Sequence, residues 1–301
     1  MHSLAIAGLG KMGYNMALRL LAQNHKPVVW NRDPQKSAAL AAKGALAAPT
    51  LTGMVALLKK PRAVWMMIPA GEPTDDLFLR LLSLLEKGDL IIDGANGNWR
   101  DAVRHAAAAE KLGVGFLDAG VSGGIWGRAN GYCIMAGGTK EAYAGAEPTL
   151  KALCQEGGAL HCGAAGAGHY VKMVHNAIEY AMMQAYGEGF ELLKASPFGG
   201  VDPASVAALW NRGSVVRSWL LELAQNAFDK DPGLEKISGI VPDSGEGRWA
   251  VEEAARLGVA VPAISSALFS RFRSQDKNNY SDRLSAALRR EFGGHAVTEK
   301  A

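Results

Sequence analysis

The 301-residue sequence has few cysteines, no long apolar run and little net charge, and each absence excludes a class of protein. The cysteines are odd in number and lack the CxxC spacing of a zinc site, which predicts no metal centre and reduced core thiols at Cys133, Cys154 and Cys162. No segment approaches the ~18–20 apolar residues that a membrane span requires. The N-terminus lacks the basic region of a secretory signal peptide. We therefore expect a cytoplasmic protein with no membrane partner.

The charge balance is close to even, because 32 Lys and Arg residues against 29 Asp and Glu residues give a formal net charge of +3. Without a basic stripe, this small excess argues against a nucleic-acid partner. The sequence is instead rich in glycine, with 36 residues, about 12% against a usual ~7%. We expect many tight turns, or positions where the backbone approaches another group closely.

Short apolar runs alternate with helical patterns over the first half of the chain. This alternation predicts a Rossmann-type, doubly wound and mostly parallel sheet with helices on both faces, an α/β fold. A further helix is expected to begin near Thr139. The expected strands cover 3–8, 27–30, 63–68, 90–93, 115–119, 132–136 and 160–162.

The pattern becomes helical after residue 162, and no further β-rich run follows. Because residues 166–195 contain no proline, one unusually long helix is expected there. We predict a dinucleotide-binding domain over 1–162 and an all-α substrate-binding and oligomerisation domain over 163–301. Later helical segments are expected over 203–230, 246–257, 262–274 and 282–292, before a frayed tail at 297–301.

A GxGxxG motif, Gly8-Leu9-Gly10-Lys11-Met12-Gly13, lies between the first expected strand and a helix. The first glycine permits a tight turn, the second lets the backbone approach a pyrophosphate, and the third allows close helix–strand packing. In this context the motif predicts a dinucleotide site formed by these six residues. The alternative is a glycine-rich turn without a ligand.

The second expected strand ends before Asn31 and Arg32, 23 residues after the first glycine of the motif, where the adenosine ribose is usually bound. An arginine at this point accommodates a 2′-phosphate and favours NADP. Asp33 would repel that phosphate, whereas Lys36 would offset the repulsion. NADP is therefore slightly favoured over NAD. Alternatively, the segment is only a turn in which Asp33 caps the next helix.

Four polar residues, Lys172, His175, Asn176 and Glu179, fall within about 100° on one face of the long helix. Their neighbours are mostly apolar, so we expect a substantially buried helix whose charged groups need partners. A lysine, a histidine, an asparagine and a glutamate beside a nucleotide site form a workable acid–base set. The alternative is a solvated face with no catalytic role.

The same segment carries a family resemblance. Residues 166–180, GAGHYVKMVHNAIEY, resemble the GxGHFVKMVHNGIEY signature of the 6-phosphogluconate dehydrogenase family, within the wider β-hydroxyacid dehydrogenases. Residues 93–98 are similar to its DGGNS motif, 121–124 to its VSGG turn and 289–295 to its RDYFGAH motif. The resemblance thus covers both expected domains and fits the short-chain form of the family.

The resemblance implies oxidative decarboxylation of 6-phosphogluconate with reduction of NAD or NADP. Lys172 would be the general base, if burial and nearby charge lower its pKa from ~10.4 towards neutrality. Glu179 would be the general acid. The remaining implied substrate residues are His175, Asn176, Asn96, Ser122, Gly123, Gly124, Tyr180, Arg289 and His295. The cofactor site would be completed by Ile68, Pro69 and Asn96.

The implied substrate is a phosphorylated sugar acid, and the implied assembly is a homodimer or homotetramer. In such an assembly Arg289 and His295 would reach the neighbouring subunit's phosphate site, where arginine pairs well with phosphate oxygens.

The sequence departs from the family pattern near this phosphate site. Where the family has KGTGKW, residues 244–249 read SGEGRW, so that Ser244 and Glu246 replace a lysine and a threonine. Ile125 stands where the family has an acid. The internal phosphate-binding arginine is left open among Arg271, Arg273 and Arg283.

Two other functions remain open. The first is a β-hydroxyacid dehydrogenase of the 3-hydroxyisobutyrate or tartronate semialdehyde type, which does not decarboxylate. The presence of Glu179 argues against it. The second is a non-catalytic nucleotide sensor, which would have no need for Lys172 and Glu179 on one helix face.

Overall fold

The computed structural model describes residues 2–276, 279–294 and 296–298 and contains two compact units, Met1–His175 and Asn176–Ala301. The described part of the first unit holds an eight-stranded sheet in the order β3-β2-β1-β4-β5-β6-β7-β8. Neighbouring strands are parallel except for β6 and β7. The strands are β1 (Ser3–Ala7), β2 (Val28–Trp30), β3 (Leu46–Ala47), β4 (Arg62–Met66), β5 (Leu90–Asp93), β6 (Gly115–Ser122), β7 (Tyr132–Gly138) and β8 (Cys154–Gly163).

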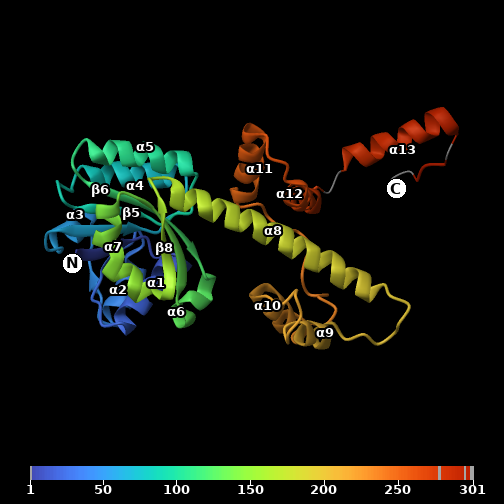
Figure 1. Ribbon diagram of the computed structural model, residues 1–301, viewed down its shortest axis with the longest axis horizontal. Coiled ribbons are helices and arrows are strands. Elements are labelled where there is room, and N and C mark those ends of the chain that lie inside the picture. The colour runs from blue at the N-terminus through green and yellow to red at the C-terminus, as the bar shows by residue number, and fades with distance from the viewer. Residues whose placement is uncertain (1, 277–278, 295, 299–301) are drawn as a thin grey trace. The chain divides into compact units, whose positions relative to one another are not determined.

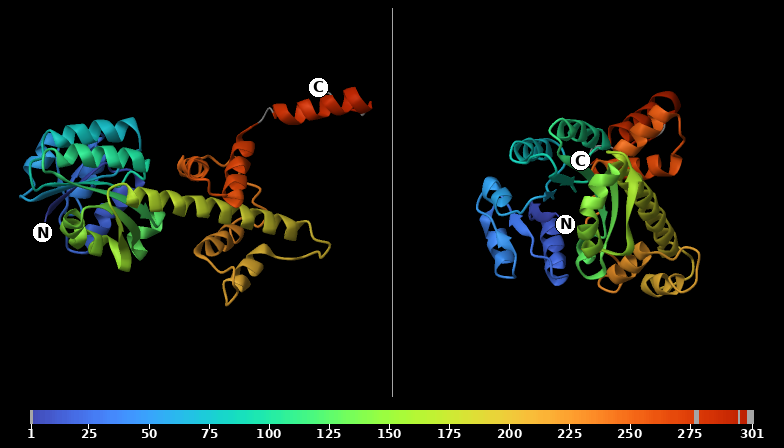
Figure 2. Two further views of the ribbon diagram at one scale, coloured as in Figure 1. Left: turned by 45° about the horizontal axis from the view of Figure 1, so that its top comes forward. Right: turned by 60° about the vertical axis from the view of Figure 1, so that its left-hand side comes forward.

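Helices cover both faces of this sheet (Figures 1 and 2). Because successive strand residues face opposite sides, Ile6 of β1 enters one core and Ala7 the other. The first core receives residues from α1 (Lys11–Ala22), α2 (Pro34–Ala41) and α7 (Lys140–Leu153). The second receives residues from α3 (Leu51–Ala56), α4 (Glu72–Leu82) and α5 (Trp99–Glu110). The predicted doubly wound fold is confirmed.

Three details of the first unit differ from expectation. The short strand β3 was not predicted, since its two residues are exposed and carry no alternation. A 3-10 turn, Gly124–Trp126, and helix α6 (Gly127–Asn130) separate β6 from β7. Strand β8 begins at Cys154, directly after α7, and is therefore longer than predicted.

The prediction of three core thiols is wrong in part. All three cysteines are free, but Cys133 is exposed and Cys162 is half-buried. Cys133 follows the buried Tyr132 on β7, so its side chain points to the opposite face of the strand. Burial raises the pKa of the Cys154 thiol to about 12, and this group is therefore a neutral thiol at pH 7.

The described part of the second unit contains helices only. Helix α8 (Ala167–Lys194) begins in the first unit and continues into the second. It is followed by α9 (Pro203–Trp210), α10 (Trp219–Phe228), α11 (Glu246–Leu257), α12 (Pro262–Gln275) and α13 (Tyr280–Gly293). No helix in the described ranges is long and apolar enough to span a membrane.

The helical segment expected over 203–230 consists of two helices. Gly213 adopts φ +88° after the end of α9, a conformation that ends helical structure. The Ser218 hydroxyl then accepts a hydrogen bond from the Leu221 N–H at 3.1 Å and caps α10.

Candidate active site

The glycine motif forms a tight turn between β1 and α1. Gly8 has φ +101°, and a Cβ at this position would overlap the Met67 carbonyl. A Cβ at Gly13 would overlap the Gly8 carbonyl, so the third glycine is required for packing. By contrast, Gly10 precedes the first turn of α1, and a Cβ there would meet no atom within 4 Å. This open backbone at a helix N-terminus fits the pyrophosphate of a dinucleotide.

The segment after β2 is tied to this turn. Asn31 Oδ1 accepts a hydrogen bond from the Leu9 N–H at 2.8 Å, and Asn31 Nδ2 donates to the Asp33 carbonyl at 3.1 Å. The Asp33 carboxylate accepts from the Gln35 N–H at 3.0 Å and caps α2. Because the carboxylate is held by this cap, Asp33 performs the structural role that we considered for it, whereas the neighbouring Arg32 side chain is exposed.

The other predicted cofactor residues lie at the carboxyl ends of β4 and β5. Ile68 is half-buried, and its Cγ2 atom would lie 2.6 Å from a Cβ at Gly8. The exposed Pro69 accepts a hydrogen bond from the Thr74 hydroxyl through its carbonyl at 2.8 Å. Carboxyl ends of parallel strands are where ligands bind in open α/β sheets.

Asn96 links the loop after β5 to the end of β6. Its Oδ1 atom accepts from the Val121 N–H at 2.9 Å, and its Nδ2 atom donates to the Val121 carbonyl at 3.3 Å. Asn96 adopts φ +52°, a conformation that asparagine tolerates better than most residues. Both backbone groups of Val121 are thereby fixed, directly before the predicted substrate residue Ser122.

Three predicted residues of the first unit form one polar chain. Ser122 Oγ lies 3.2 Å from His175 Nε2, and His175 Nδ1 lies 3.4 Å from Lys172 Nζ. A protonated lysine can only donate to Nδ1, in which case Nε2 carries the imidazole proton and donates to the serine. Lys172 is only 5% exposed, so its amine is held in a largely desolvated place.

Glycines bring β6 and the following turn close to this chain. A Cβ at Gly120 would overlap Lys172 Cβ, so a side chain at this position would displace the lysine. Gly123 has φ +120° and Gly124 has φ +51°, conformations that glycine adopts more readily than other residues. Ile125, the residue that departs from the family's acid, is 61% exposed.

Asp118 is a positioning residue that the sequence did not single out. It is fully buried on β6, and its carboxylate accepts from the Gly166 N–H at 2.6 Å and from the His169 N–H at 2.7 Å. His169 Nε2 donates in turn to the Asp93 carbonyl at 3.1 Å. These contacts hold the start of α8 against β5 and β6, one turn before Lys172. The available signal was a lone carboxylate inside an apolar strand pattern.

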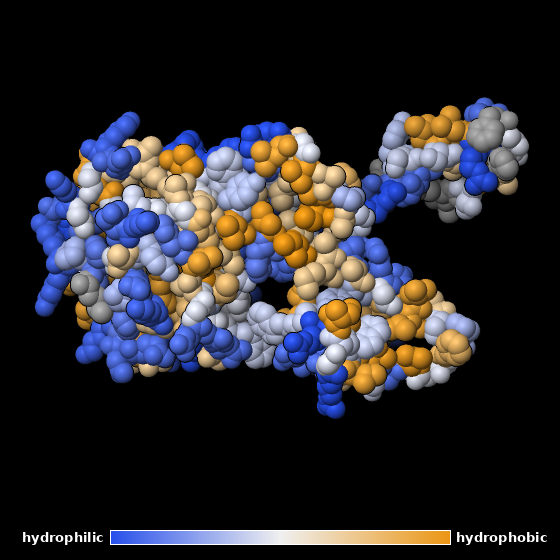
Figure 3. All heavy atoms as spheres, in the orientation of Figure 1, coloured by the Kyte–Doolittle hydropathy of each residue, from blue (hydrophilic) through white to orange (hydrophobic). Residues whose placement is uncertain are grey.

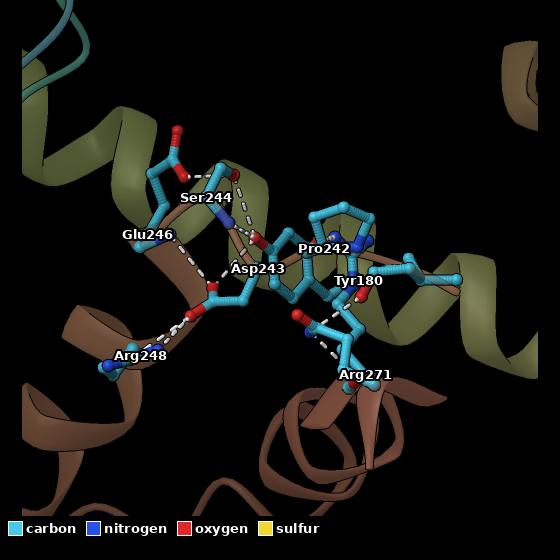
Figure 4. A network of polar contacts seen from close by, with 10 residues as sticks. Tyr180, Pro242, Asp243, Ser244, Glu246, Arg248 and Arg271 are labelled. Carbon is cyan, nitrogen blue, oxygen red and sulfur yellow. Dashed lines mark hydrogen bonds and ion pairs between the residues drawn. The ribbon is translucent and has the colours of Figure 1, made fainter. Parts of the chain in front are cut away.

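A second polar network lies wholly in the second unit (Figure 4). Asn176 Nδ2 donates to Glu246 Oε1 at 2.9 Å, and Ser244 Oγ donates to Glu246 Oε2 at 2.6 Å. Ser244 Oγ also lies 3.0 Å from the Tyr180 hydroxyl, which reaches Asp243 Oδ1 at 3.3 Å. The network thus joins two predicted substrate residues, Asn176 and Tyr180, to the SGEGRW segment.

Arg271 is the candidate internal arginine that lies beside Tyr180. Its guanidinium carbon is 3.3 Å from the centroid of the Tyr180 ring, and Nη1 donates to the Pro242 carbonyl at 3.0 Å (Figure 4). Arg273 instead pairs with Asp282 at 3.0 Å, while Arg283 lies over the ring of Tyr280.

Three further predicted residues are Glu179 on α8, Arg289 on α13, and His295. Glu179 is half-buried on α8, two turns after Lys172 on the same face. Arg289 is exposed on α13, and His295 lies outside the described residues. The roles assigned to all three stay predictions.

The expectation of a substantially buried α8 is wrong for the single chain. Lys172, Met173 and Ala177 are buried, but Val174 is 38% exposed and Ile178 is 50% exposed. The helix buries one stripe and leaves much of its apolar surface uncovered.

Comparison with known protein families matches nearly the whole chain. The family model for the NAD binding domain of 6-phosphogluconate dehydrogenase matches residues 3–166, and the model for the C-terminal domain of 6-phosphogluconate dehydrogenase matches residues 168–299. The chain is 43% identical over 298 residues to the Bacillus subtilis protein YqeC. It is 40% identical over 299 residues to the NAD(+)-dependent, decarboxylating 6-phosphogluconate dehydrogenase of Haloferax volcanii. Both alignments cover 99% of each chain.

Longer relatives and solved structures agree with these matches. The chain is 35% identical to a decarboxylating 6-phosphogluconate dehydrogenase of Saccharomyces cerevisiae but covers only 59% of that protein. The Plasmodium falciparum 6-phosphogluconate dehydrogenase structure superposes with a TM-score of 0.83 at 29% identity, covering 99% of this chain and 66% of that one. The Mycobacterium tuberculosis 3-hydroxyisobutyrate dehydrogenase gives 0.71 at 27% identity, covering 89% and 91%. The chain therefore belongs to the 6-phosphogluconate dehydrogenase family and is an oxidoreductase with an NAD-binding domain, for which either NAD or NADP is consistent.

Proposed function

We propose that the protein oxidises and decarboxylates 6-phosphogluconate to ribulose 5-phosphate and CO2, reducing NAD or NADP. The observation that carries this proposal is the contact series from Ser122 through His175 to the buried Lys172. This series supports the proposal because an alcohol oxidation requires a base, and Lys172 is a buried amine in contact with polar groups near the carboxyl end of β6.

Lys172 takes the proton of the substrate hydroxyl. A nicotinamide held at the glycine turn would supply the acceptor for the hydride from the carbon that carries this hydroxyl. His175 holds the lysine amine, and Ser122 holds the other side of the imidazole. The resulting β-keto acid loses CO2, because the carbonyl group stabilises the electron pair left behind. Glu179 then donates a proton to the carbon that carried the carboxylate.

The proposed binding groups follow the two units. In the first, the glycine turn, Asn31 and Arg32 hold the dinucleotide, with NADP slightly favoured through Arg32. Asn96, Ser122 and the following glycines hold the acid end of the substrate. In the second, Tyr180 and Arg271 bind the distal phosphate, because a guanidinium pairs with phosphate oxygens in a planar fork. The proposed domains, 1–162 and 163–301, divide the chain before the end of the first compact unit at His175.

A second candidate is a β-hydroxyacid dehydrogenase that binds a smaller, non-phosphorylated acid. It is favoured by Glu246, whose buried carboxylate lies one hydrogen bond from Ser244, near the proposed phosphate site. Initial rates of nicotinamide reduction separate the two candidates. Reduction with 6-phosphogluconate supports the proposal, and reduction only with 3-hydroxyisobutyrate or glycerate, the alcohol that yields tartronate semialdehyde, overturns it. The ratio of rates with NAD and NADP reports the role of Arg32.

Glu179→Gln is expected to separate the two chemical steps. Hydride transfer should persist in part, whereas ribulose 5-phosphate release should fall about 100-fold, because the general acid is lost. Rapid-quench analysis of ketone and pentulose measures both steps. Glu188→Gln, an exposed change on the same helix, serves as the control. Equal loss of both steps in the Glu179 variant would contradict the separate roles.

Two glycine substitutions distinguish cofactor contact from packing. Gly10→Ala should leave the melting temperature nearly unchanged but raise the cofactor Kd about tenfold or more, because its methyl group occupies the pyrophosphate position. Gly13→Ala should lower the melting temperature, because its methyl group overlaps the Gly8 carbonyl. Calorimetry and thermal denaturation measure these effects. Unchanged cofactor affinity in Gly10→Ala would refute the assignment of the turn.

We also propose a homodimer or homotetramer. Apolar side chains gather at the surface (Figure 3). In the second unit, Ile178 is 50% exposed, Leu192 74% and Leu209 65%. Such side chains at a surface are typical of a subunit interface. In the assembly, Arg289 and His295 would complete the neighbouring subunit's phosphate site. Light scattering after size exclusion measures the mass, and a monomer at micromolar concentration would refute the assembly.

A further inference from the structure

We propose that Glu246 is a positioning residue that sets the orientation of the Asn176 amide and thereby makes that residue a hydrogen-bond acceptor for a substrate hydroxyl. The proposal rests on the function proposed above, because it assigns the substrate-binding role of Asn176 to one atom, Oδ1. Glu246 itself touches no substrate atom in this account. It acts through Asn176.

The chemistry of the contact decides which amide atom faces the carboxylate. Glu246 is 8% exposed, at the first position of α11, where the helix dipole favours a negative charge. An ionised carboxylate has acceptor atoms only, so the atom 2.9 Å from Glu246 Oε1 is the Asn176 nitrogen. Because the amide is planar, its oxygen is turned away from Glu246. A neighbour that both donates and accepts would leave the two orientations open.

The second carboxylate oxygen of Glu246 sets the direction of the hydrogen bonds at Ser244, which contacts Tyr180. Ser244 uses its hydroxyl hydrogen on Glu246 Oε2 at 2.6 Å, so its oxygen can only accept from the Tyr180 hydroxyl 3.0 Å away. The one hydrogen of that hydroxyl is shared with Asp243 Oδ1 at 3.3 Å. The Ser244 N–H donates to the same phenol oxygen at 3.2 Å. A Cβ at Gly247 would lie 2.5 Å from the Tyr180 ring, so glycine is needed for this close approach.

The residue type at position 246 decides whether the Asn176 amide is held in one orientation. At position 246, the related family pattern has threonine, whose hydroxyl is both donor and acceptor and cannot impose one amide orientation. With Glu246, the donors of Asn176 and Ser244 both point to one buried group. The substrate class that matches an acceptor atom at Asn176 is an acid that presents a hydroxyl there, rather than a carbonyl or carboxylate oxygen.

A reciprocal exchange of the two side chains tests the proposal. Asn176→Asp places two carboxylates in contact and should lower kcat/KM for 6-phosphogluconate about 100-fold. Glu246→Gln should lower it about tenfold, because a glutamine accepts either amide orientation. In the double variant, the nitrogen of the introduced glutamine donates to the introduced aspartate, and a carboxylate oxygen is again turned outwards. Its kcat/KM should return to within about tenfold of the wild-type value.

The control is Glu253→Gln, which alters another buried carboxylate of α11, one that pairs with Arg256. It should leave kcat/KM within about twofold of the wild-type value. A double variant no more active than Asn176→Asp would overturn the proposal, because it would show that the amide nitrogen is the group that the substrate needs.

Thermal denaturation of the wild-type protein, the two single variants and the double variant separates this inference from the proposed function. The double variant should melt above both single variants, since each single change breaks the contact and the exchange restores it. If this holds while the wild-type protein does not oxidise 6-phosphogluconate, the proposed function is wrong and the contact is real. Additive melting temperatures would show that Glu246 does not orient Asn176.

Discussion

Lys172→Met is expected to lower kcat for 6-phosphogluconate oxidation about 1,000-fold, because the variant has no group at this position to take the hydroxyl proton. Methionine is close to lysine in length and apolar, so it fits the buried position without leaving an uncompensated charge. The cofactor Kd should stay within about threefold of the wild-type value, since the glycine turn lies at β1 and α1.

The control for this change is Lys194→Met, at the exposed C-terminal end of the same helix. Single-turnover kinetics in the presence of saturating cofactor measure the chemical step without product release. A Lys172 variant with more than about a tenth of the wild-type rate would contradict the assignment of the base.

Asp118→Asn is expected to lower kcat about 100-fold and to reduce the melting temperature, without contact between this residue and the substrate. The amide retains one acceptor oxygen, but its nitrogen would face a backbone N–H that now has no acceptor. The first turn of α8 would shift, and Lys172 would move with it. Small displacements of this kind have large effects on a positioned base.

A matched surface change tests whether this loss is specific. Asp101 lies in the first turn of α5 and pairs with Arg104 at 2.5 Å, and Asp101→Asn should alter the melting temperature and kcat little. An Asp118 variant with normal kcat would show that the start of α8 is held by its other contacts, such as that from His169 to Asp93.

Local sequence patterns predicted the elements whose formation depends on residues close together in the sequence. The glycine motif identified its turn because positive φ and close approach at Gly8 leave no alternative residue. The proline-free segment likewise predicted α8 to within one residue at each end. The boundary between α9 and α10 was missed, since it depends on the left-handed Gly213 and the Ser218 cap within an apolar pattern.

Contacts between distant segments could not be predicted from these patterns. Asp118 reaches residues 48 and 51 positions away, and Glu246 contacts Asn176 across 70 positions. In the sequence, Glu246 was only a departure from the family pattern. In the structure, it is a buried acceptor for a predicted substrate residue. Each carboxylate acquires its role when folding brings hydrogen-bond donors to it. Local sequence patterns do not identify those donors, because they are distant in the sequence.

The stoichiometry of CO2 release most directly tests the central claim. The protein is incubated with 6-phosphogluconate labelled at its carboxylate carbon, and labelled CO2 and reduced nicotinamide are measured in the same reaction. One labelled CO2 is expected for each nicotinamide reduced. Reduction without labelled CO2 would show a dehydrogenase that does not decarboxylate and would contradict the account.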